Sequence, residues 1–331
     1  NKYDLEHPRD EKGLLSKYSQ SQINSMSEKQ KVKAFNELWK NPIVSNSFEP
    51  GSTYKPFTVA GGLEDGILKG NEHYYCSGYK QVGKYKIHCS HREGHGNLSL
   101  SDSIAYSCNV ALMDIAFKEG KDVFAKYQKD FNFGVKTGID LPGEAETAGL
   151  LHGADQMTNV DLATSSFGQS FNCSMIQMAS SFSSLVNGGS YYKPHVVRQI
   201  WDENGNLIEN KNPTLLKRTI SKETSDIIKD YMLGVVQEGT GAKAAVEGYD
   251  VGGKTGTAEK QPRGNGKYLV SFIGYAPQEN PEVVVYAVID EPNVAEQASS
   301  SYAMQLASDI MKEVFPYLGV KKSAANEDNA G

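Results

Sequence analysis

The sequence predicts an α+β protein whose sheet is antiparallel. Helical patterns fill the middle of the chain, whereas three apolar strand candidates follow one another near its end, at 251–260, 268–276 and 282–290. Strands that succeed one another without intervening helices favour antiparallel pairing. A long helical pattern at 295–315 comes after them and should flank the sheet. With 331 residues, 39% of them hydrophobic, the chain can bury a substantial core.

The remaining elements are expected in the following order. Residues 1–50 are polar, with their clearest helical spacing at 26–40, and a helix should run from near Gly51 to the glycines at 61 and 62. Residues 63–98 are rich in Gly, Tyr, His and Cys, which is typical of short strands and loops. An Asn-Gly pair at 204–205 predicts a hairpin over 193–210. Four further stretches have helical patterns: 101–118, 121–130, 172–187 and 221–238.

Charge and hydropathy limit the partners of the chain. The net charge is −6 and no basic block is present, so we expect no nucleic acid partner. No stretch approaches 18 consecutive apolar residues, so we expect no membrane span within these residues. One domain is expected over 1–320, followed by a disordered polar tail at 321–331.

A serine and a lysine three residues apart open the helix predicted near Gly51. Ser52 and Lys55 would share one face of that helix. The free N–H groups and the positive dipole end at a helix start would stabilise an oxyanion and weaken the lysine's hold on its proton. The pair therefore has the form of a nucleophile and its base, although the pattern alone also fits a capped helix with a surface lysine.

Two short motifs downstream supply what such a nucleophile lacks. Ser107 and Asn109 lie at a predicted helix start, where the hydroxyl can relay a proton and the amide can orient the lysine. The run Lys254–Thr257 lies on a strand candidate among small residues, so a substrate backbone could lie against it. Its lysine offers a fixed positive charge to a carboxylate.

Each motif has a second copy, and context separates the copies. Ser77–Lys80 lies in a Gly/Tyr segment without helical period, and Ser190–Lys193 opens an extended segment. Ser170–Asn172 is interpreted as a turn and helix cap. Lys136–Gly138 leads into Leu-Pro-Gly and is interpreted as a structural loop.

With the three motifs in this order, the chain resembles the penicillin-binding proteins. The separations of Ser107 and Lys254 from Ser52 look like those of the class B transpeptidase domain rather than of a β-lactamase. The resemblance implies one transpeptidase domain of the penicillin-binding protein and serine β-lactamase fold, with an all-helical part, an α/β part and the active site between them. It is spread over these segments: FEPGSTYK, GHG at 94–96, FNFGVKTGIDLPGE, SFGQS, VNGG, and VGGKTGTAEK followed by FIGYAP.

The resemblance also implies a role for each motif residue in a serine-type peptidoglycan D,D-transpeptidase. Ser52 would attack the penultimate D-Ala carbonyl of a stem peptide with Lys55 as general base, and an amine of a neighbouring stem would complete the cross-link. β-Lactams would acylate the same serine, and the chemistry would need no cofactor. The proton relay would be formed by Ser107 and Asn109. The substrate-binding strand would be formed by Lys254, Thr255, Gly256 and Thr257. The oxyanion hole would be formed by the backbone N–H groups of Ser52 and Thr257.

Two other functions share this chemistry: a β-lactam sensor domain, and a hydrolase of the D,D-carboxypeptidase or β-lactamase kind. A hydrolase needs a carboxylate that activates water, and nothing in the sequence places Glu144 or Glu146 near Ser52. The resemblance favours the synthetic enzymes of Gram-positive spore-formers, with division or sporulation wall-synthesis partners. It also implies a place on the outer face of the cell membrane, with an anchor and a pedestal domain ahead of Asn1.

Cysteine and histidine gather in one stretch, residues 73–96, which holds four of the seven histidines and two of the four cysteines. If 85–91 is extended, Cys89 and His91 share one strand face. Together with Cys76 and His95 they would make a tetrahedral set for a structural Zn²⁺ that braces the active site.

Other states of these side chains stay open. No standard Cys-x₂-Cys spacing is present, so a Cys76–Cys89 disulfide and free thiols with packed histidines are the alternatives. Cys108 and Cys173 are interpreted as small buried core residues.

Overall fold

A three-stranded antiparallel sheet forms the centre of the protein, as predicted. The computed structural model describes residues 4–323, so residues 324–331 of the expected disordered tail lie outside the described part. Strand β12 (Tyr268–Ala276) pairs along its length with β11 (Gly252–Glu259) on one side and β13 (Val283–Asp290) on the other. Every residue of β12 after Tyr268 is buried, so the sheet is covered on both faces.

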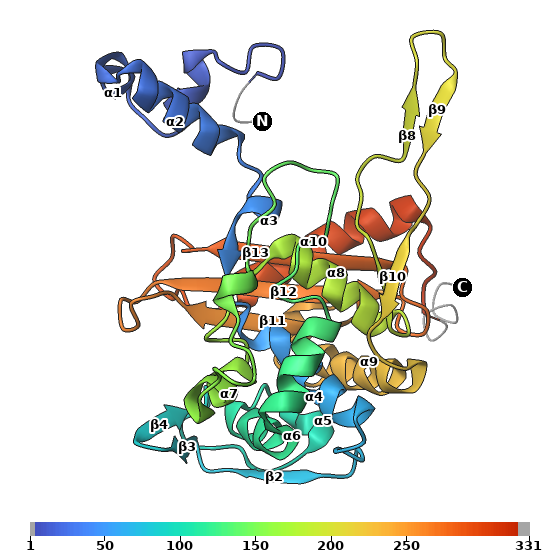
Figure 1. Ribbon diagram of the computed structural model, residues 1–331. Helices are drawn as coiled ribbons and strands as arrows, with labels where there is room; N and C mark the ends of the chain where they lie inside the picture. Colours follow the sequence, from blue (N-terminus) through green and yellow to red (C-terminus); the bar gives the residue numbers. More distant parts are fainter. Residues whose placement is uncertain (1–3, 324–331) are drawn as a thin grey trace.

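Helices cover the two faces of this sheet (Figure 1). Helix α10 (Ser301–Leu318) packs on β12 and β13, while α8 (Met175–Val186) packs on β13 and α9 (Lys222–Gln237) on β11. The side chains of β12 alternate accordingly. Phe272 belongs to the core cluster that includes α10 residues, whereas Ile273 belongs to the larger cluster shared with α8 and α9.

A helical part lies beside the sheet. Helix α4 packs against the long helix α6, which in turn packs against α7, while α5 packs against α9. A 3₁₀ turn, η2, precedes α4 and contacts β11, so the two parts of the molecule meet there. These elements span Gly51–Tyr54 (η2), Lys55–Glu64 (α4), Leu100–Ala105 (α5), Asn109–Asp130 (α6) and Asn159–Ser165 (α7).

Five short two-stranded pairs complete the described strands. The region 63–98 forms β2–β5 and β3–β4, and the predicted hairpin over 193–210 is present as β8–β9, which projects from the body in Figure 1. The ten strands are β1 (Ser47–Phe48), β2 (His73–Cys76), β3 (Tyr79–Val82), β4 (Tyr85–His88), β5 (Gly96–Ser99), β6 (Cys173–Ser174), β7 (Ser190–Tyr192), β8 (Gln199–Trp201), β9 (Leu207–Asn210) and β10 (Leu215–Arg218).

The first helices form a small cluster of their own. The 3₁₀ helix η1 (Glu11–Ser16), α1 (Gln20–Ser25) and α2 (Glu28–Trp39) bury Leu14, Ile23 and Phe35 against one another. In Figure 1 this unit stands away from the sheet, joined through α3 (Pro42–Ser45). Two further 3₁₀ turns are η3 (Ala148–Leu150) and η4 (Ala242–Ala244). No helix among residues 4–323 has both the length and the apolar character that a bilayer crossing requires.

The prediction of one helix over 101–118 is wrong in one respect, because the structure has two helices there, separated by a turn. Helix α5 ends at Ala105 and α6 begins at Asn109, with Ser107 in the left-handed region at φ 58°. The predicted break near residue 120 is present as a kink at Gly120 within α6. Helix α7 was not predicted, because seven residues show little periodicity, although its Thr158–Asp161 capping box was a readable signal.

Candidate active site

The turn that carries Ser52 is pressed against the sheet. Gly51 has φ 60°, and its N–H donates to the Gly168 carbonyl at 2.8 Å. A Cβ atom at Gly51 would lie 2.7 Å from the Thr257 carbonyl oxygen, which leaves room for glycine alone. Ser52 follows directly and is partly exposed, so its hydroxyl is accessible beside strand β11.

Lys55 is fully buried at the start of α4, and its ammonium has three acceptors. Its Nζ donates to the Ser107 carbonyl at 2.5 Å, the Ser107 Oγ at 3.0 Å and the Asn109 Oδ1 at 2.7 Å. These bonds use all the donors of a protonated lysine. Burial lowers the pKa of Lys55 to about 8. Because of this shift, Lys55 is a neutral amine in about a tenth of the protein molecules at neutral pH.

The turn between α5 and α6 holds Ser107 in a strained conformation. A left-handed non-glycine residue costs about 1–3 kcal/mol, and such strain persists only where the surroundings fix it. Here the Cys108 N–H donates to the Ser103 carbonyl at 3.0 Å, and the Cys108 Sγ caps α6 by accepting from the Ala111 N–H at 3.4 Å. The strained turn aims both the carbonyl and the hydroxyl of Ser107 at Lys55.

Strand β11 carries a second buried lysine. The Lys254 Nζ donates to the Thr255 Oγ1 at 3.3 Å, and that hydroxyl lies 3.1 Å from the Thr240 Oγ1. Burial, with a smaller contribution from Lys55, holds the pKa of Lys254 well below its usual value. At Gly256 a Cβ atom would lie 2.3 Å from the Ser271 Oγ, so this strand accepts no side chain there.

One cavity of about 680 Å³ brings the predicted residues together. It is lined from the helical part by Ser52, Ser107 and Asn109, and from the sheet by Thr255 and Thr257. Lys55 and Lys254 lie buried next to these residues. The geometry therefore gathers all three motifs at the junction of the two parts.

Several cavity residues were not singled out from the sequence. Tyr106, Gln169, Thr240 and Arg263 also line the cavity, and only their proximity in the fold reveals them. Among the described lining residues the one carboxylate is Glu259, whose Oε1 accepts from the Gly264 N–H at 2.6 Å.

The second copies of the motifs lie elsewhere. Ser77 is exposed between β2 and β3, and Ser190 opens strand β7. Lys136 is exposed and pairs with Glu146 at 3.4 Å. None of these side chains lines the cavity that contains Ser52.

The loop that carries the earlier Lys-Thr-Gly copy is closed on itself. Glu144 accepts from the backbone and hydroxyl of Thr137 at 2.6 and 2.7 Å. The Glu144 carboxylate therefore forms its hydrogen bonds within its own loop.

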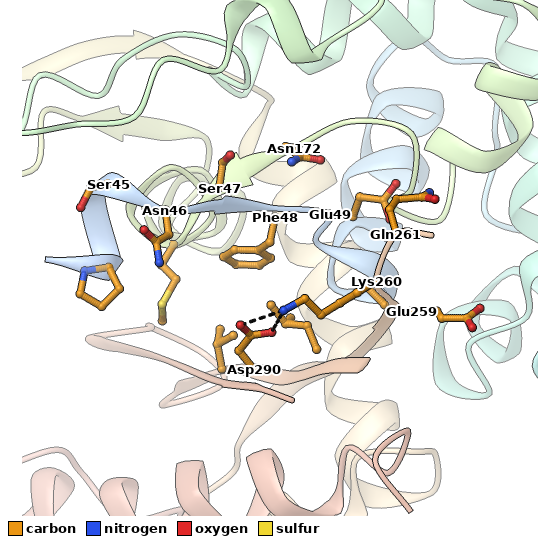
Figure 2. A pocket seen from close by; sticks show the side chains of 15 residues that line it. Ser45, Asn46, Ser47, Phe48, Glu49, Asn172, Glu259, Lys260, Gln261 and Asp290 are labelled. Atoms are coloured by element: carbon orange, nitrogen blue, oxygen red, sulfur yellow. Dashed lines mark hydrogen bonds and ion pairs between the residues drawn. The ribbon is translucent and has the colours of Figure 1, made fainter. Parts of the chain in front are cut away.

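A second hollow, of about 700 Å³, lies at the outer end of β11. Figure 2 shows the Phe48 ring in this pocket and the Lys260 ammonium bonded to Asp290. The two Lys260–Asp290 distances are 2.9 and 3.1 Å, and the same ammonium also reaches Glu291 at 2.6 Å. A lysine neutralised by two carboxylates is a poor base, so this pocket lacks the chemistry of the Ser52 cavity.

Three cysteines and one histidine meet behind the Ser107 turn. Their ligand atoms all lie within 4.8 Å of one another, in the set Cys76, Cys89, His95 and Cys108. All four cysteines of the chain are free thiols, so no Cys76–Cys89 disulfide is formed. Cys173 lies apart from this set and is buried in the main core.

The prediction that His91 belongs to this set is wrong. Strand β4 ends at His88, so Cys89 and His91 do not share one strand face, and His91 is exposed. Cys108 takes the place predicted for His91. The sequence placed Cys108 in the core, which is correct, but gave no sign that the core at this point is a cluster of thiols.

A serine next to a buried lysine, opposite a Lys-Thr-Gly strand in one cavity, defines the class of Ser-x-x-Lys acyl-transfer proteins. The family described as penicillin binding protein transpeptidase domain matches residues 15–312, and the chain belongs to this family.

The names of similar proteins are consistent with this family. Stage V sporulation protein D of Bacillus subtilis (strain 168) is 39% identical, over 85% of this chain and 44% of its own length. The probable peptidoglycan D,D-transpeptidase PenA of Neisseria flavescens is 32% identical, over 85% of this chain and 66% of its own. A structure of penicillin binding protein 3 from Mycobacterium tuberculosis complexed with aztreonam is 26% identical, with a TM-score of 0.77 over 86% of this chain and 65% of that one. The chain thus spans less than half the length of the sporulation protein that it matches.

Proposed function

We propose that this chain is the catalytic domain of a peptidoglycan D,D-transpeptidase that works through a Ser52 acyl-enzyme. The observation that carries the proposal is the buried Lys55, bonded to Ser107 and Asn109 next to the Ser52 cavity. The three acceptors of its ammonium among the described residues are the Ser107 carbonyl, the Ser107 Oγ and the Asn109 Oδ1, none of them a carboxylate, and burial is the main cause of its lowered pKa. The name of the Neisseria relative supports the same reaction.

Acylation begins when the neutral Lys55 amine accepts the Ser52 proton. The Ser52 Oγ forms a bond to the penultimate D-Ala carbonyl carbon of a stem peptide, and the oxyanion is stabilised by backbone N–H groups of Ser52 and Thr257. The C–N bond to the terminal D-Ala then breaks. The proton passes to that leaving amine through the Ser107 hydroxyl, which lies 3.0 Å from the Lys55 Nζ.

The substrate is held by the β11 side of the cavity. The terminal carboxylate of D-Ala is an anion, and Lys254 with the Thr255 and Thr257 hydroxyls offers a positive charge and donors on the strand. An amine of a neighbouring stem peptide then attacks the acyl-enzyme, which frees Ser52 and forms the cross-link. β-Lactams acylate Ser52 in the same way and block this second step.

We place this reaction in wall synthesis during spore formation or at the septum, on the outer face of the cell membrane and with other wall-synthesis proteins as partners. The name of the sporulation relative supports the first of these settings.

Hydrolysis is the second candidate, and the cavity disfavours it. A hydrolase needs a carboxylate placed to activate water, and Glu259, the one acid that lines the cavity in the described residues, is bonded to the Gly264 N–H. A sensor domain would acylate without forming cross-links.

The test combines a fluorescent penicillin with intact-mass measurement. Ser52→Ala should abolish labelling, whereas Ser77→Ala and Ser190→Ala should label as the parent does. The parent adduct should persist for hours, and synthetic stem peptides should yield a cross-linked dimer. Loss of the adduct within minutes would identify a hydrolase, and a stable adduct without any dimer would identify a sensor.

A further inference from the structure

The thiol and imidazole cluster draws its members from four separate elements. Cys76 ends β2, Cys89 follows β4, His95 precedes β5, and Cys108 caps α6. The Cys89 N–H donates to the Gly78 carbonyl at 2.8 Å, which ties the β3–β4 hairpin back to the segment after Cys76. Chain segments up to 32 positions apart thus converge on one point, and all three cysteines are buried.

The separations within the cluster fit a tetrahedral ion. Zinc–sulfur bonds of about 2.3 Å and zinc–nitrogen bonds of about 2.0 Å place two ligand sulfurs about 3.8 Å apart, and a sulfur and a nitrogen about 3.5 Å apart. The Cys89 Sγ lies 4.0 Å from the Cys108 Sγ and 3.6 Å from the His95 Nδ1. A disulfide requires about 2.05 Å between sulfurs and serves two residues, so it does not account for the convergence of four.

We propose that this cluster binds one structural Zn²⁺ ion that fixes the Ser107 turn. Three thiolates and one imidazole complete a four-coordinate closed site, with no position left for water or substrate. The ligand set is Cys76, Cys89, His95 and Cys108.

The site is joined to the active site through the backbone. Cys108 lies between Ser107 and Asn109, so an ion that holds its sulfur also holds the strained turn. On the other side, the Asn109 Nδ2 donates to the carbonyl of His88, the residue before Cys89, at 3.2 Å. Asn109 is therefore held by the backbone next to Cys108 on one side and next to Cys89 on the other, while its Oδ1 accepts from the Lys55 ammonium. The metal positions the residues of the proton relay and performs none of the chemistry.

Metal content decides the question without reference to activity. The full chain is purified under reducing conditions in buffers free of chelators, and its zinc is measured. We expect about one zinc per chain, lost in Cys76→Ser, Cys108→Ser and His95→Ala. The matched controls are His91→Ala, the neighbouring histidine outside the cluster, and Cys173→Ala, the remaining buried cysteine; both should keep their zinc.

Replacement of the zinc by Co²⁺ gives a second readout on the parent protein. A tetrahedral Cys₃His site should give visible absorption bands and sulfur-to-cobalt charge transfer, so the test stands even if a ligand variant fails to fold. Removal of the metal should lower the rate of Ser52 acylation at least about tenfold, and added Zn²⁺ should restore it.

The outcomes are separable from those of the Ser52 test. Three results would each contradict the proposed zinc site. They are metal-free protein that acylates at the full rate, a disulfide among these cysteines, and zinc that is retained in Cys108→Ser. None of these results bears on whether Ser52 is the nucleophile.

Discussion

The two Lys-Thr-Gly copies begin with lysines whose surroundings are opposite. Lys254 is fully buried and bonded to Thr255 beside the cavity, whereas Lys136 is exposed and paired with Glu146. A buried charge that meets a substrate carboxylate forms a charge-assisted hydrogen bond, and a solvated pair contributes little.

We expect Lys254→Ala to lower the second-order rate constant for penicillin acylation by about 10- to 100-fold, which corresponds to the loss of one charge-assisted hydrogen bond. Lys136→Ala should change it less than about twofold. Stopped-flow or gel-based acylation rates measure both. Equal losses in the two variants would show that the β11 lysine has no special part in binding.

The sequence singled out the residues that meet at the Ser52 cavity more fully than the ligands of the proposed ion. Ser52 could be chosen over Ser77 and Ser190 because local context, a helix start against extended segments, separates the copies. Cys108 could not be assigned in the same way. Its neighbours in the chain are site residues, and its contact with Cys89 depends on how the β3–β4 hairpin folds back onto α6.

At the scale of elements, Glu64 joins two helices. It lies at the end of α4 and accepts from the backbone and hydroxyl of Ser221, the N-cap of α9, at 2.9 and 2.7 Å. The Thr224 hydroxyl donates to the same oxygen at 2.6 Å. Partial burial raises the pKa of Glu64, but these hydrogen bonds outweigh it and leave the pKa below its usual value.

Glu64→Gln should therefore destabilise the protein by about 1 kcal/mol at neutral pH. Since the folded-state pKa is depressed, this contribution is complete above the unfolded-state pKa of about 4.3 and is lost as the pH falls through the folded value. Urea unfolding at pH 7 and at pH 4 measures the difference, with the exposed Glu238→Gln on the same helix pair as control. A deficit that stays constant on acidification would contradict this account.

The elements that the sequence predicted are those whose form is decided locally. Strands β11, β12 and β13 have apolar runs, and they form the antiparallel sheet that was expected. A helix start at Ser107 and Asn109 was predicted and is present, but the left-handed conformation of Ser107 could not be foreseen, because Ser107 is held by Lys55, which is 52 positions away in the chain. Helix α10 begins at Ser301 rather than at 295, and its N-cap Ser300 makes no side-chain capping hydrogen bond.

At the scale of the molecule, the active site depends on the junction of two parts. The helical part supplies Ser52 and Lys55 from η2 and α4, and strand β11 of the sheet supplies Lys254 and Thr257. The turn η2 contacts both β11 and α4, so it transmits the position of one part to the other. A change that separates the two parts should therefore impair acylation even where it touches no site residue.

The N-terminal unit of η1, α1 and α2 is outside this junction. Its core cluster is separate from those of the sheet and the helical part, and it stands apart in Figure 1. Asn41, which caps α3, marks the point where the chain joins the body.

A truncated chain that begins at Asn41 should keep the fold and the reaction. It loses only a small cluster that other elements do not need, so its melting temperature should fall by no more than about 2–4 °C. Its acylation rate should stay within about twofold of the parent rate, since no residue of the cavity is removed. Differential scanning calorimetry and penicillin labelling test both expectations. A tenfold slower acylation with an unchanged melting temperature would show that these helices act on the active site, because the body would then be folded but its cavity altered.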